Sequence, residues 1–314
     1  MKHKRPLFIL LLMVCSPALA LKSDREQPMT IDADEIGMDL KTGGRTFDGN
    51  VIAEQGSMRL EADKLVVETE DNELSKATAF GEPAIFRQRP EGKEQDVIGR
   101  AQQLEFDQVH DIVTLHQRAS LTHGGDSVKG HTITYTLSSE QMNVRGGDTQ
   151  ARPQAVKTDG QEPASMDADE MDLNFSTGQR EFRGDVLMEQ GTTKLQADKL
   201  IAQYKDEELE KATAFGEPAV FRERPEGEQL DVVGEALRLE LDHANDIVTM
   251  YEDASITKGG DKILGEIIVY NIITEEMTVR GGGVLQGAQG DEATQPLERP
   301  RIIIQPKPSQ PSTE

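Results

Sequence analysis

The chain is poor in cysteine and in aromatic side chains. Cys15 is the only cysteine among 314 residues, tryptophan is absent, and aromatic residues make up 4% of the chain. Cys15 lies in an N-terminal segment that we expect to be removed. The mature chain would then contain no cysteine, which excludes a disulfide, a thiolate zinc site and a cysteine nucleophile. Apolar residues make up only 36%, which is thin for two closed cores and fits a sheet with one narrow apolar channel.

Long hydrophobic runs are also missing from the N-terminal segment. A basic start at residues 1–5 precedes the apolar stretch Leu7–Val14, and small residues follow at Ala18-Leu19-Ala20. The apolar stretch is much shorter than the roughly 20 residues that a membrane helix needs. This order of segments is typical of a secretory signal peptide, so we predict a signal peptide at residues 1–20, cleaved after Ala20.

Basic residues are outnumbered by acidic ones. Lys and Arg total 34 and Asp and Glu total 57, a net charge of −23, which becomes −26 when the signal peptide leaves with Lys2, Lys4 and Arg5. Such a charge repels phosphates and anionic lipid headgroups, which argues against a nucleic-acid partner and against electrostatic docking on a membrane. The charge is expected to keep an extended β surface soluble.

What the chain does contain is a long internal repeat. The segment Lys76–Ala84 returns letter for letter as Lys211–Ala219, and Met29–Gly146 aligns on Ala164–Gly281 without a gap at a constant shift of 135 positions. About half of the aligned positions are identical. A gap-free repeat of this length is a duplicated domain rather than a short solenoid repeat. We therefore predict domain 1 over residues 27–147, a segment of 148–161 between the copies, domain 2 over 162–283 and a Pro/Gln/Gly-rich tail over 284–314.

Each copy has the pattern of an all-β domain. Met29, Ile31 and Ala33 alternate with polar residues, which indicates a strand with one apolar face. Short runs of this kind are bounded by turn residues such as Gly81-Glu82-Pro83, and no convincing amphipathic helix separates them. We expect antiparallel sheets of many short strands. Residues 148–161 are a linker, or a loop that lets the sheet of copy one continue into copy two. The tail is expected to be mostly disordered, with Arg301–Gln305 a candidate for one further strand.

Catalytic or metal-binding residues are not indicated. The acidic segment Asp32–Glu35 recurs as Asp167–Glu170, and paired carboxylates are possible calcium ligands. The alternation places the acids on the solvent face, where they are ordinary, and there is no EF-hand spacing. Only His243 lies in copy two, opposite no histidine of copy one, which excludes a histidine site shared by both copies. We therefore expect no catalytic residue, no metal and no cofactor.

A series of short motifs in each copy resembles the LptA/OstA-like family of periplasmic lipopolysaccharide transport proteins. The order and spacing of the motifs carry the resemblance, because none of them is specific alone, and His131 replaces an aspartate of the family pattern. In copy one they are Gln27–Asp34, Phe47–Val51, Gln55-Gly56, Ala62–Leu65, Gly81–Phe86 and Gly130–Tyr135.

The resemblance implies two tandem β-jellyrolls, open at both ends, whose strands are able to form one continuous twisted sheet. In the family an apolar groove holds the acyl chains of lipopolysaccharide, and domains stack head to tail between the inner-membrane extraction complex and the outer-membrane translocon. The implied function is a periplasmic bridge that binds lipopolysaccharide through its lipid A acyl chains. It is not an enzyme and has no nucleic-acid partner.

Family alignment and strand alternation together nominate the groove residues. They are Met29, Ile31, Phe86, Leu104, Phe106, Val113, Leu115 and Leu121 in copy one, and Met166, Phe221, Leu239, Leu241, Val248, Met250 and Ile256 in copy two. Each of them is equally well explained as a core residue, since groove and core are the same surface here. We also predict that Tyr135–Val144 of copy one lies beside Met166–Leu173 of copy two, because open jellyrolls leave unpaired strands at their ends.

Other functions remain open at this point. The same fold could serve an inner-membrane-anchored transport component or the periplasmic part of the translocon. A cleavable signal argues against the anchor, and no long C-terminal barrel follows for the translocon. A β-helix enzyme would show short regular rungs, in contrast to the 135-residue period. A structural β-adhesin would have a polar interior.

Overall fold

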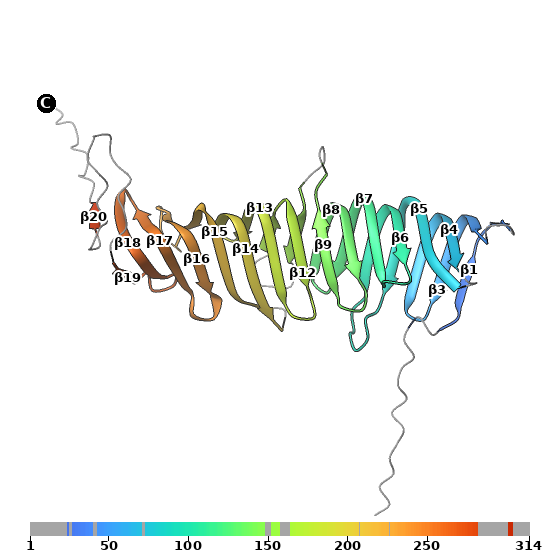
Figure 1. The fold of residues 1–314 in the computed structure, drawn as a ribbon. Coiled ribbons are helices and arrows are strands. Elements are labelled where there is room, and N and C mark those ends of the chain that lie inside the picture. The colour runs from blue at the N-terminus through green and yellow to red at the C-terminus, as the bar shows by residue number, and fades with distance from the viewer. Residues whose placement is uncertain are drawn as a thin grey trace, which may run out of the picture.

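The computed structural model describes residues 24, 27–39, 43–70, 73–147, 152–157, 164–206, 208–225, 227–281 and 301–303. These residues form one elongated sheet whose strands run across its long axis, with β1 and β20 at opposite ends (Figure 1). Both the all-β class and the continuous sheet expected from the sequence are confirmed. Within the described part of the chain, no helix has the length and apolar character required to cross a membrane.

The two copies have the same order of strands. Copy one contains β1 (Met29–Asp32), β2 (Glu35–Met38), β3 (Arg45–Gln55), β4 (Met58–Glu70), β5 (Glu73–Gln88), β6 (Val97–Asp107), β7 (Ile112–His123), β8 (Asp126–Thr136) and β9 (Gln141–Arg145). After β10 (Gln154–Lys157), copy two contains β11 (Ala164–Asp167), β12 (Glu170–Asn174), β13 (Gln179–Gln190), β14 (Thr193–Lys205), β15 (Glu208–Glu223), β16 (Val232–Asp242), the 3₁₀ turn η2 (His243–Asn245), β17 (Ile247–Lys258), β18 (Asp261–Asn271) and β19 (Met277–Arg280). The tail adds β20 (Arg301–Ile303).

Long strands pair antiparallel with their chain neighbours, and the register shifts near the middle of each pair. Between β5 and β6 the pairing jumps from Phe80 to Ala84, and between β7 and β8 it jumps from His116 to Ala119. Extra residues on one strand bend it and increase its twist. Because the shifts recur from one pair to the next, the whole sheet bends along one line.

The bend is built from residues that tolerate unusual backbone angles. Gly49 has φ +80°, and a side chain there would meet the Asp34 carboxylate at 2.5 Å. Asp34 in turn accepts a hydrogen bond of 2.8 Å from Asn50 Nδ2. In copy two Gly184 (φ +78°) lies against Asp169 in the same way. The second carboxylate of the repeated acidic segment, Asp34 in copy one and Asp169 in copy two, thus has a structural role at the bend of the sheet.

Bending brings opposite ends of the hairpins together. Lys93, in the β5–β6 loop, lies 3.8 Å from the carboxylate of Glu140, in the β8–β9 turn. His123, at the end of β7, lies 3.5 Å from the same carboxylate. The sheet is therefore folded over, and its inward face forms one continuous buried core through both copies. The apolar side of each alternating strand, such as Val113 and Leu115, faces that core.

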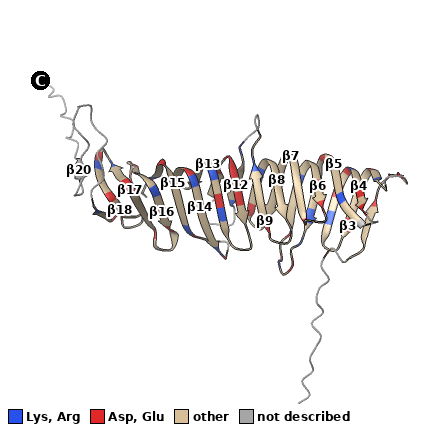
Figure 2. Cartoon of the chain, viewed as in Figure 1, with Lys and Arg blue, Asp and Glu red and all other residues tan. Residues whose placement is uncertain are grey.

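Charged side chains lie on the outward face and along the hairpin ends. Across β12 and β13, Arg183 pairs with Asp172, with Glu181 at 2.7 Å and with Glu170 at 3.4 Å. Acidic and basic residues alternate there (Figure 2). Partly exposed pairs of this kind contribute little stability individually. They neutralise neighbouring charges on a strongly acidic chain.

The two copies join edge to edge. Strand β9 pairs with β12, so the predicted contact between the end of copy one and the start of copy two is present in these strands. The structure adds the register, with Met142 opposite Leu173 and Val144 opposite Met171. The prediction was wrong at the first residue of each segment. Tyr135 lies in β8 and pairs with β9 within copy one, and Met166 lies in β11, which pairs with β10. Strand β10 also pairs with β8, so it lies between the copies. The segment expected to be a linker or a connecting loop thus contributes a strand of its own.

The tail ends in a strand that pairs with copy two. Strand β20 runs antiparallel to β18 in the register Lys262↔Ile303, Ile263↔Ile302 and Leu264↔Arg301. The candidate strand in the tail is thereby confirmed over three of its residues. The expected signal peptide and most of the expected disordered tail lie outside the described residues.

Candidate functional site

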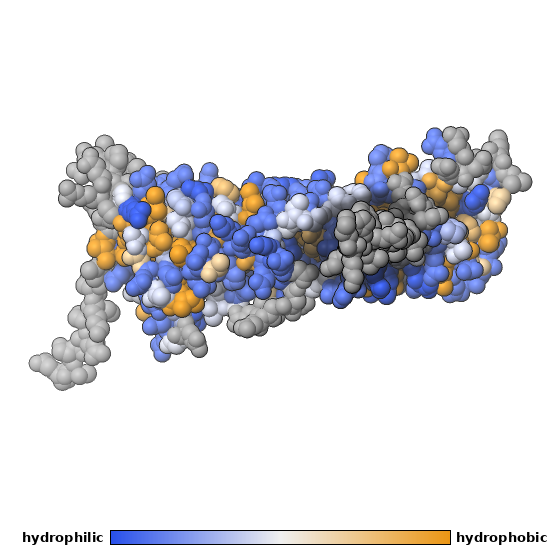
Figure 3. Space-filling view, turned by 90° about the horizontal axis from the view of Figure 1, so that it is seen from below, coloured by the Kyte–Doolittle hydropathy of each residue, from blue (hydrophilic) through white to orange (hydrophobic). Residues whose placement is uncertain are grey.

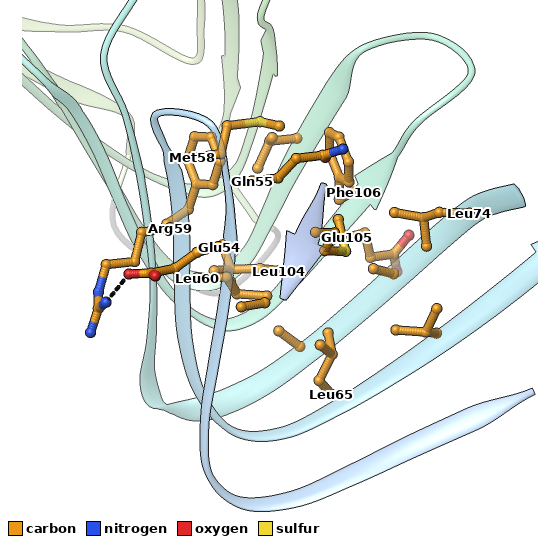
Figure 4. Close-up of a pocket in the computed structure, with 17 residues that line it drawn as sticks. Glu54, Gln55, Met58, Arg59, Leu60, Leu65, Leu74, Leu104, Glu105 and Phe106 are labelled. Carbon is orange, nitrogen blue, oxygen red and sulfur yellow. Dashed lines mark hydrogen bonds and ion pairs between the residues drawn. The ribbon is translucent and has the colours of Figure 1, made fainter. Parts of the chain in front are cut away.

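An apolar hollow of copy one lies inside the folded sheet near its N-terminal end. It holds about 600 Å³ of space outside the atoms, part of it open to solvent. The labelled side chains Met58, Leu60, Leu65, Leu104 and Phe106 surround it (Figure 4). Leu74 closes it on the side of β5. The walls therefore come from β1 and from the inward faces of β3 to β7.

The cavity exists because small residues lie opposite large ones. In the β5–β6 pair, Ala77 is the partner of Phe106 and Ala79 is the partner of Leu104. Two large residues in such positions would fill the space, whereas alanine leaves it open. Met58, on the opposite hairpin end, also lines the cavity together with Phe106. Folding of the sheet therefore encloses a space that no single hairpin would form.

Charged groups near the cavity point outward and are paired. Arg59 forms an ion pair with Glu54 outside the apolar walls (Figure 4). Lys76 donates to the Glu105 carboxylate at 2.9 Å and thereby lowers the pKa of Glu105. The interior offers apolar surface and no unpaired charge from these groups, which suits an apolar ligand rather than an ionic one.

Copy two contains the same cavity at the same positions. Its lining residues are Met188, Thr193, Leu195, Ala212, Ala214, Phe221, Leu239, Leu241 and Val248. Every one of them is the partner, at the 135-residue shift, of a residue that lines the cavity of copy one. The copy-two cavity is smaller, at about 350 Å³.

One substitution between the copies accounts for the direction of this difference, and a second changes the lining. Met188 replaces Ala53, so a longer side chain enters the space. Met29, which lines the cavity of copy one, corresponds to Ala164, which is absent from the lining of the second cavity. The two cavities are equivalent in position and unequal in size.

The residues nominated from the sequence divide into two groups. Those that line a cavity are Met29, Phe86, Leu104, Phe106 and Val113 in copy one and Phe221, Leu239, Leu241 and Val248 in copy two. Those that face the interior beyond the two cavities are Ile31, Leu115, Leu121, Met166, Met250 and Ile256. All of the second group except the half-buried Ile31 are buried, and they pack in the same continuous core.

Sequence reasoning missed several wall residues. Met58, Leu60, Leu65 and Leu74 line the cavity of copy one, and Leu195 lines that of copy two. Leu60 and Leu65 lie on either side of the register shift of β4, where the inward face changes parity. Alternation counted straight through the strand therefore fails, and alignment of the two copies would have been the better signal.

A second, polar cluster closes the sheet where the copies meet. Arg180 of β13 donates to Asp126 of β8 at 2.6 Å, with both side chains almost fully buried. The guanidinium lies over the Tyr204 ring at 3.8 Å. Nearby, the His123 ring stacks on Phe175 at 4.1 Å, and burial lowers the pKa of His123. This cluster fastens the end of copy one to the start of copy two.

The described residues contain no group of three or more His, Cys, Asp or Glu side chains placed to hold a metal ion. Glu82 and Glu217 each precede a proline with a cis peptide bond at the bend, and Gln102 Nε2 donates to Glu82 at 3.2 Å. These acids are part of the bend of the sheet.

The arrangement defines a class of protein: an elongated, folded-over β-sheet with equivalent apolar cavities in two tandem domains. The profile of the family described as LptA/(LptD N-terminal domain) LPS transport protein matches residues 30–141 and again residues 165–276. These two segments cover most of the chain, and the chain belongs to this family.

Individual relatives match one copy's length of the chain. The lipopolysaccharide export system protein LptA of Escherichia coli (strain K12) is 34% identical over 136 residues, which cover 43% of this chain and 73% of that protein. LptH of Pseudomonas aeruginosa is 29% identical over 154 residues, 49% of this chain and 85% of that protein. The crystal structure of LptH, described as the LptA homologous periplasmic component of a lipopolysaccharide transport device, covers 46% of this chain and 96% of its own, with a TM-score of 0.40 and 27% identity.

Proposed function

We propose that this protein is a periplasmic bridge that carries lipopolysaccharide between the inner and outer membranes. Its folded sheet shelters the lipid A acyl chains, and its copies stack head to tail. Flanking partners would be the inner-membrane extraction complex and the outer-membrane translocon of the same pathway. The protein would act by binding and transport rather than by catalysis.

One observation carries the proposal: the same positions form an apolar cavity in both copies, along one continuous core. Burial of an acyl chain contributes about 0.8 kcal/mol per CH₂, so exposing a chain of about 12 methylenes to water would cost roughly 10 kcal/mol. Two equivalent cavities in line allow an acyl chain to move from one shelter to the next without full exposure. The family and the relatives named above support lipopolysaccharide as the cargo.

Stacking is supported by the ends of the sheet. Strands β1 and β2 pair with β3 alone among the described strands, whereas their counterparts β11 and β12 also pair with β10 and β9. An edge of this kind invites pairing with another chain. Contacts between unlike ends do not close on themselves, so they generate filaments. The internal junction supplies the geometry that such a contact would repeat.

A photo-crosslinker placed in the chain tests the cargo. A benzoylphenylalanine at Phe106 or at Phe221, both cavity residues, should crosslink to lipopolysaccharide in cells. The matched controls are Phe80 and Phe215, which are the same residue type at 38% and 37% exposure and line neither cavity. They should give little lipopolysaccharide adduct.

Two outcomes would count against the proposal. Equal labelling at Phe80 and Phe106 would indicate adventitious contact with lipid. No adduct at either cavity position in a folded, periplasmic protein would remove lipopolysaccharide as the cargo. Depletion of the protein should also stall lipopolysaccharide at the inner membrane. Unimpaired transport would instead favour an accessory OstA-fold component of the envelope or a structural β protein.

A further inference from the structure

The apolar cavity of copy one adjoins a polar hollow at the side of the folded sheet. We call this hollow the mouth, and it holds about 1540 Å³ of space outside the atoms, part of it open to solvent. Met58 and Phe106 line both the cavity and the mouth, and they lie on the same side of the cavity in Figure 4. Ser57, Lys93 and Glu140 are among the polar residues of the mouth. An apolar space and a polar one thus share a wall, which suits an amphiphilic ligand.

The outer surface gives an acyl chain less shelter than the interior does. Hydrophilic residues predominate on the face of the molecule shown in Figure 3, and the hydrophobic ones lie in separate groups. The tail of an amphiphile is therefore held in the cavity, where its methylene groups are buried. A charged headgroup stays outside, because moving an ion into an apolar cavity carries a large desolvation cost. A lipid with its tail in the cavity consequently has its headgroup in the mouth.

Lys93 lies between the mouth and a second polar hollow. The second hollow holds about 1290 Å³ of space outside the atoms, part of it open to solvent, and residues of both copies line it. Lys93 lines both hollows. Its ammonium group is 3.8 Å from the Glu140 carboxylate, beyond hydrogen-bond distance, and its side chain is 48% exposed. The ammonium group can therefore turn toward an anion without losing a hydrogen bond.

The neighbouring basic groups are committed to other contacts. Arg89, the other cation that lines the mouth, donates to Asp96 at 2.8 Å. Burial lowers the pKa of His123, whose ring lies 3.5 Å from Glu140, so the imidazole is neutral at pH 7. Among the described residues that line the mouth, Lys93 is thus the cation available to a ligand.

Copy two reverses the charge at this position. The loop Arg89–Lys93 returns as Arg224–Glu228 with a single change, which puts Glu228 in the place of Lys93. Lys258, which corresponds to His123, forms an ion pair with Glu275. The Glu275 carboxylate, with Glu228 nearby, raises the pKa of Lys258. The cation of copy two is therefore held by carboxylates, and the loop beside it repels an anion.

We propose that Lys93 binds the phosphate of the cargo's headgroup, so that the mouth of copy one is an anion subsite and its counterpart in copy two is not. The proposal rests on the proposed function and adds which group of the lipid is recognised and by which copy. A lysine ammonium donates charge-assisted hydrogen bonds to phosphate oxygens. With the tail in the larger cavity and the phosphate at Lys93, a lipid is held more firmly in copy one than in copy two.

Phosphate-dependent binding in each copy tests the proposal. Full-length protein with benzoylphenylalanine at Phe106 is titrated with lipid A, or with lipid A whose phosphates have been removed, and the photo-adduct reports the occupancy of copy one. Lys93→Glu, which copies Glu228, should weaken binding of the phosphorylated lipid by about tenfold and change binding of the dephosphorylated lipid by less than about twofold. Lys93→Arg keeps the charge and should retain binding of both lipids. Glu228→Lys, read out at Phe221, should strengthen binding of the phosphorylated lipid alone in copy two.

Lys64→Glu controls for the change in net charge. Lys64 is 45% exposed, lies 3.0 Å from Asp48, and lines neither the cavity nor the two polar hollows. This variant should bind both lipids as the unmodified protein does. Thermal unfolding followed by circular dichroism confirms that each variant is folded. Should Lys93→Glu unfold the chain by repulsion from Glu140, Lys93→Gln removes the charge without adding an anion and should weaken binding of the phosphorylated lipid by about threefold.

The outcomes separate this proposal from the proposed function. If Lys93→Glu weakens binding of both lipids equally, Lys93 has a structural role and the phosphate subsite is refuted. If Lys93→Glu binds the phosphorylated lipid as well as Lys64→Glu does, Lys93 does not recognise the headgroup. In both cases the cargo stands, because lipid still reaches the cavity. Absence of adduct at Phe106 and at Phe221 with either lipid would instead refute the cargo, and the subsite with it.

Discussion

The buried ion pair at the internal junction offers the sharpest test of how the two copies are held together. Arg180 and Asp126 approach to 2.6 Å, with side-chain exposures of 10% and 12%. Replacing one partner of a buried pair leaves the other charge desolvated, which typically costs 3–5 kcal/mol. Arg180→Met keeps much of the aliphatic bulk and removes the charge. It also removes the guanidinium from the Tyr204 ring, a loss of about 1 kcal/mol.

We expect Arg180→Met to lower the free energy of unfolding by about 3–4 kcal/mol at pH 7. The measurement is urea denaturation followed by far-ultraviolet circular dichroism, with hydrogen exchange to locate the effect. Exchange should accelerate in β8 and β13, the strands that carry the two partners. A second substitution, Asp126→Asn, removes the stranded charge and should restore about 1–2 kcal/mol, because a neutral amide is less costly to bury.

The chain supplies its own control. Arg45 is the counterpart of Arg180 in copy one, where β1 and β2 pair with β3 alone among the described strands, and it is half-buried. Arg45→Met should cost less than about 0.5 kcal/mol at a concentration that keeps the protein monomeric. If Arg180→Met costs no more than Arg45→Met, or if the Asp126→Asn double variant is no more stable than the single one, the ion pair does not hold the junction.

Two further predictions use differences between the copies. Ala53→Met, which copies Met188 into the first cavity, should displace about two methylene groups of a bound acyl chain and weaken lipid binding there roughly tenfold. Met188→Ala should strengthen lipid binding in copy two. Titration with fluorescent lipid A measures both variants, and affinities equal to that of the unmodified protein would refute the cavity assignment. Burial and the nearby Glu275 raise the pKa of Glu223 to about 7. Because the pKa is raised, folding favours the neutral carboxyl. The contribution of Glu223 to the free energy of unfolding is therefore fully present below about pH 4.5 and falls, by at most about 3 kcal/mol, as the pH rises through 7. Glu223→Gln, which introduces the residue type of Gln88 in copy one, should reduce the difference in unfolding free energy between pH 5 and pH 8, measured by urea denaturation. An unchanged difference between the two pH values would contradict this prediction.

Part of the architecture was readable from the chain alone. The repeat, counted at one shift, predicted two domains of one kind, and period-2 alternation predicted their β class. Alternation also identified inward residues such as Leu104 and Val113, because successive strand residues face opposite sides whatever surrounds them. The edge pairing of β9 with β12 followed from the same reasoning, since an open sheet with apolar ends needs a neighbour.

Other features depended on tertiary contacts between residues far apart in the chain. Gln154–Lys157 has little strand propensity of its own and is a strand because it lies between β8 and β11, whose edges supply its hydrogen-bond partners. Arg180 and Asp126 are 54 positions apart, and only the bend that folds the sheet over brings them together. The same bend places Met58 beside Phe106 and turns two apolar faces into an enclosed cavity. Local periodicity specifies which face of a strand is apolar, but which surfaces enclose a space depends on how the strands bend and meet.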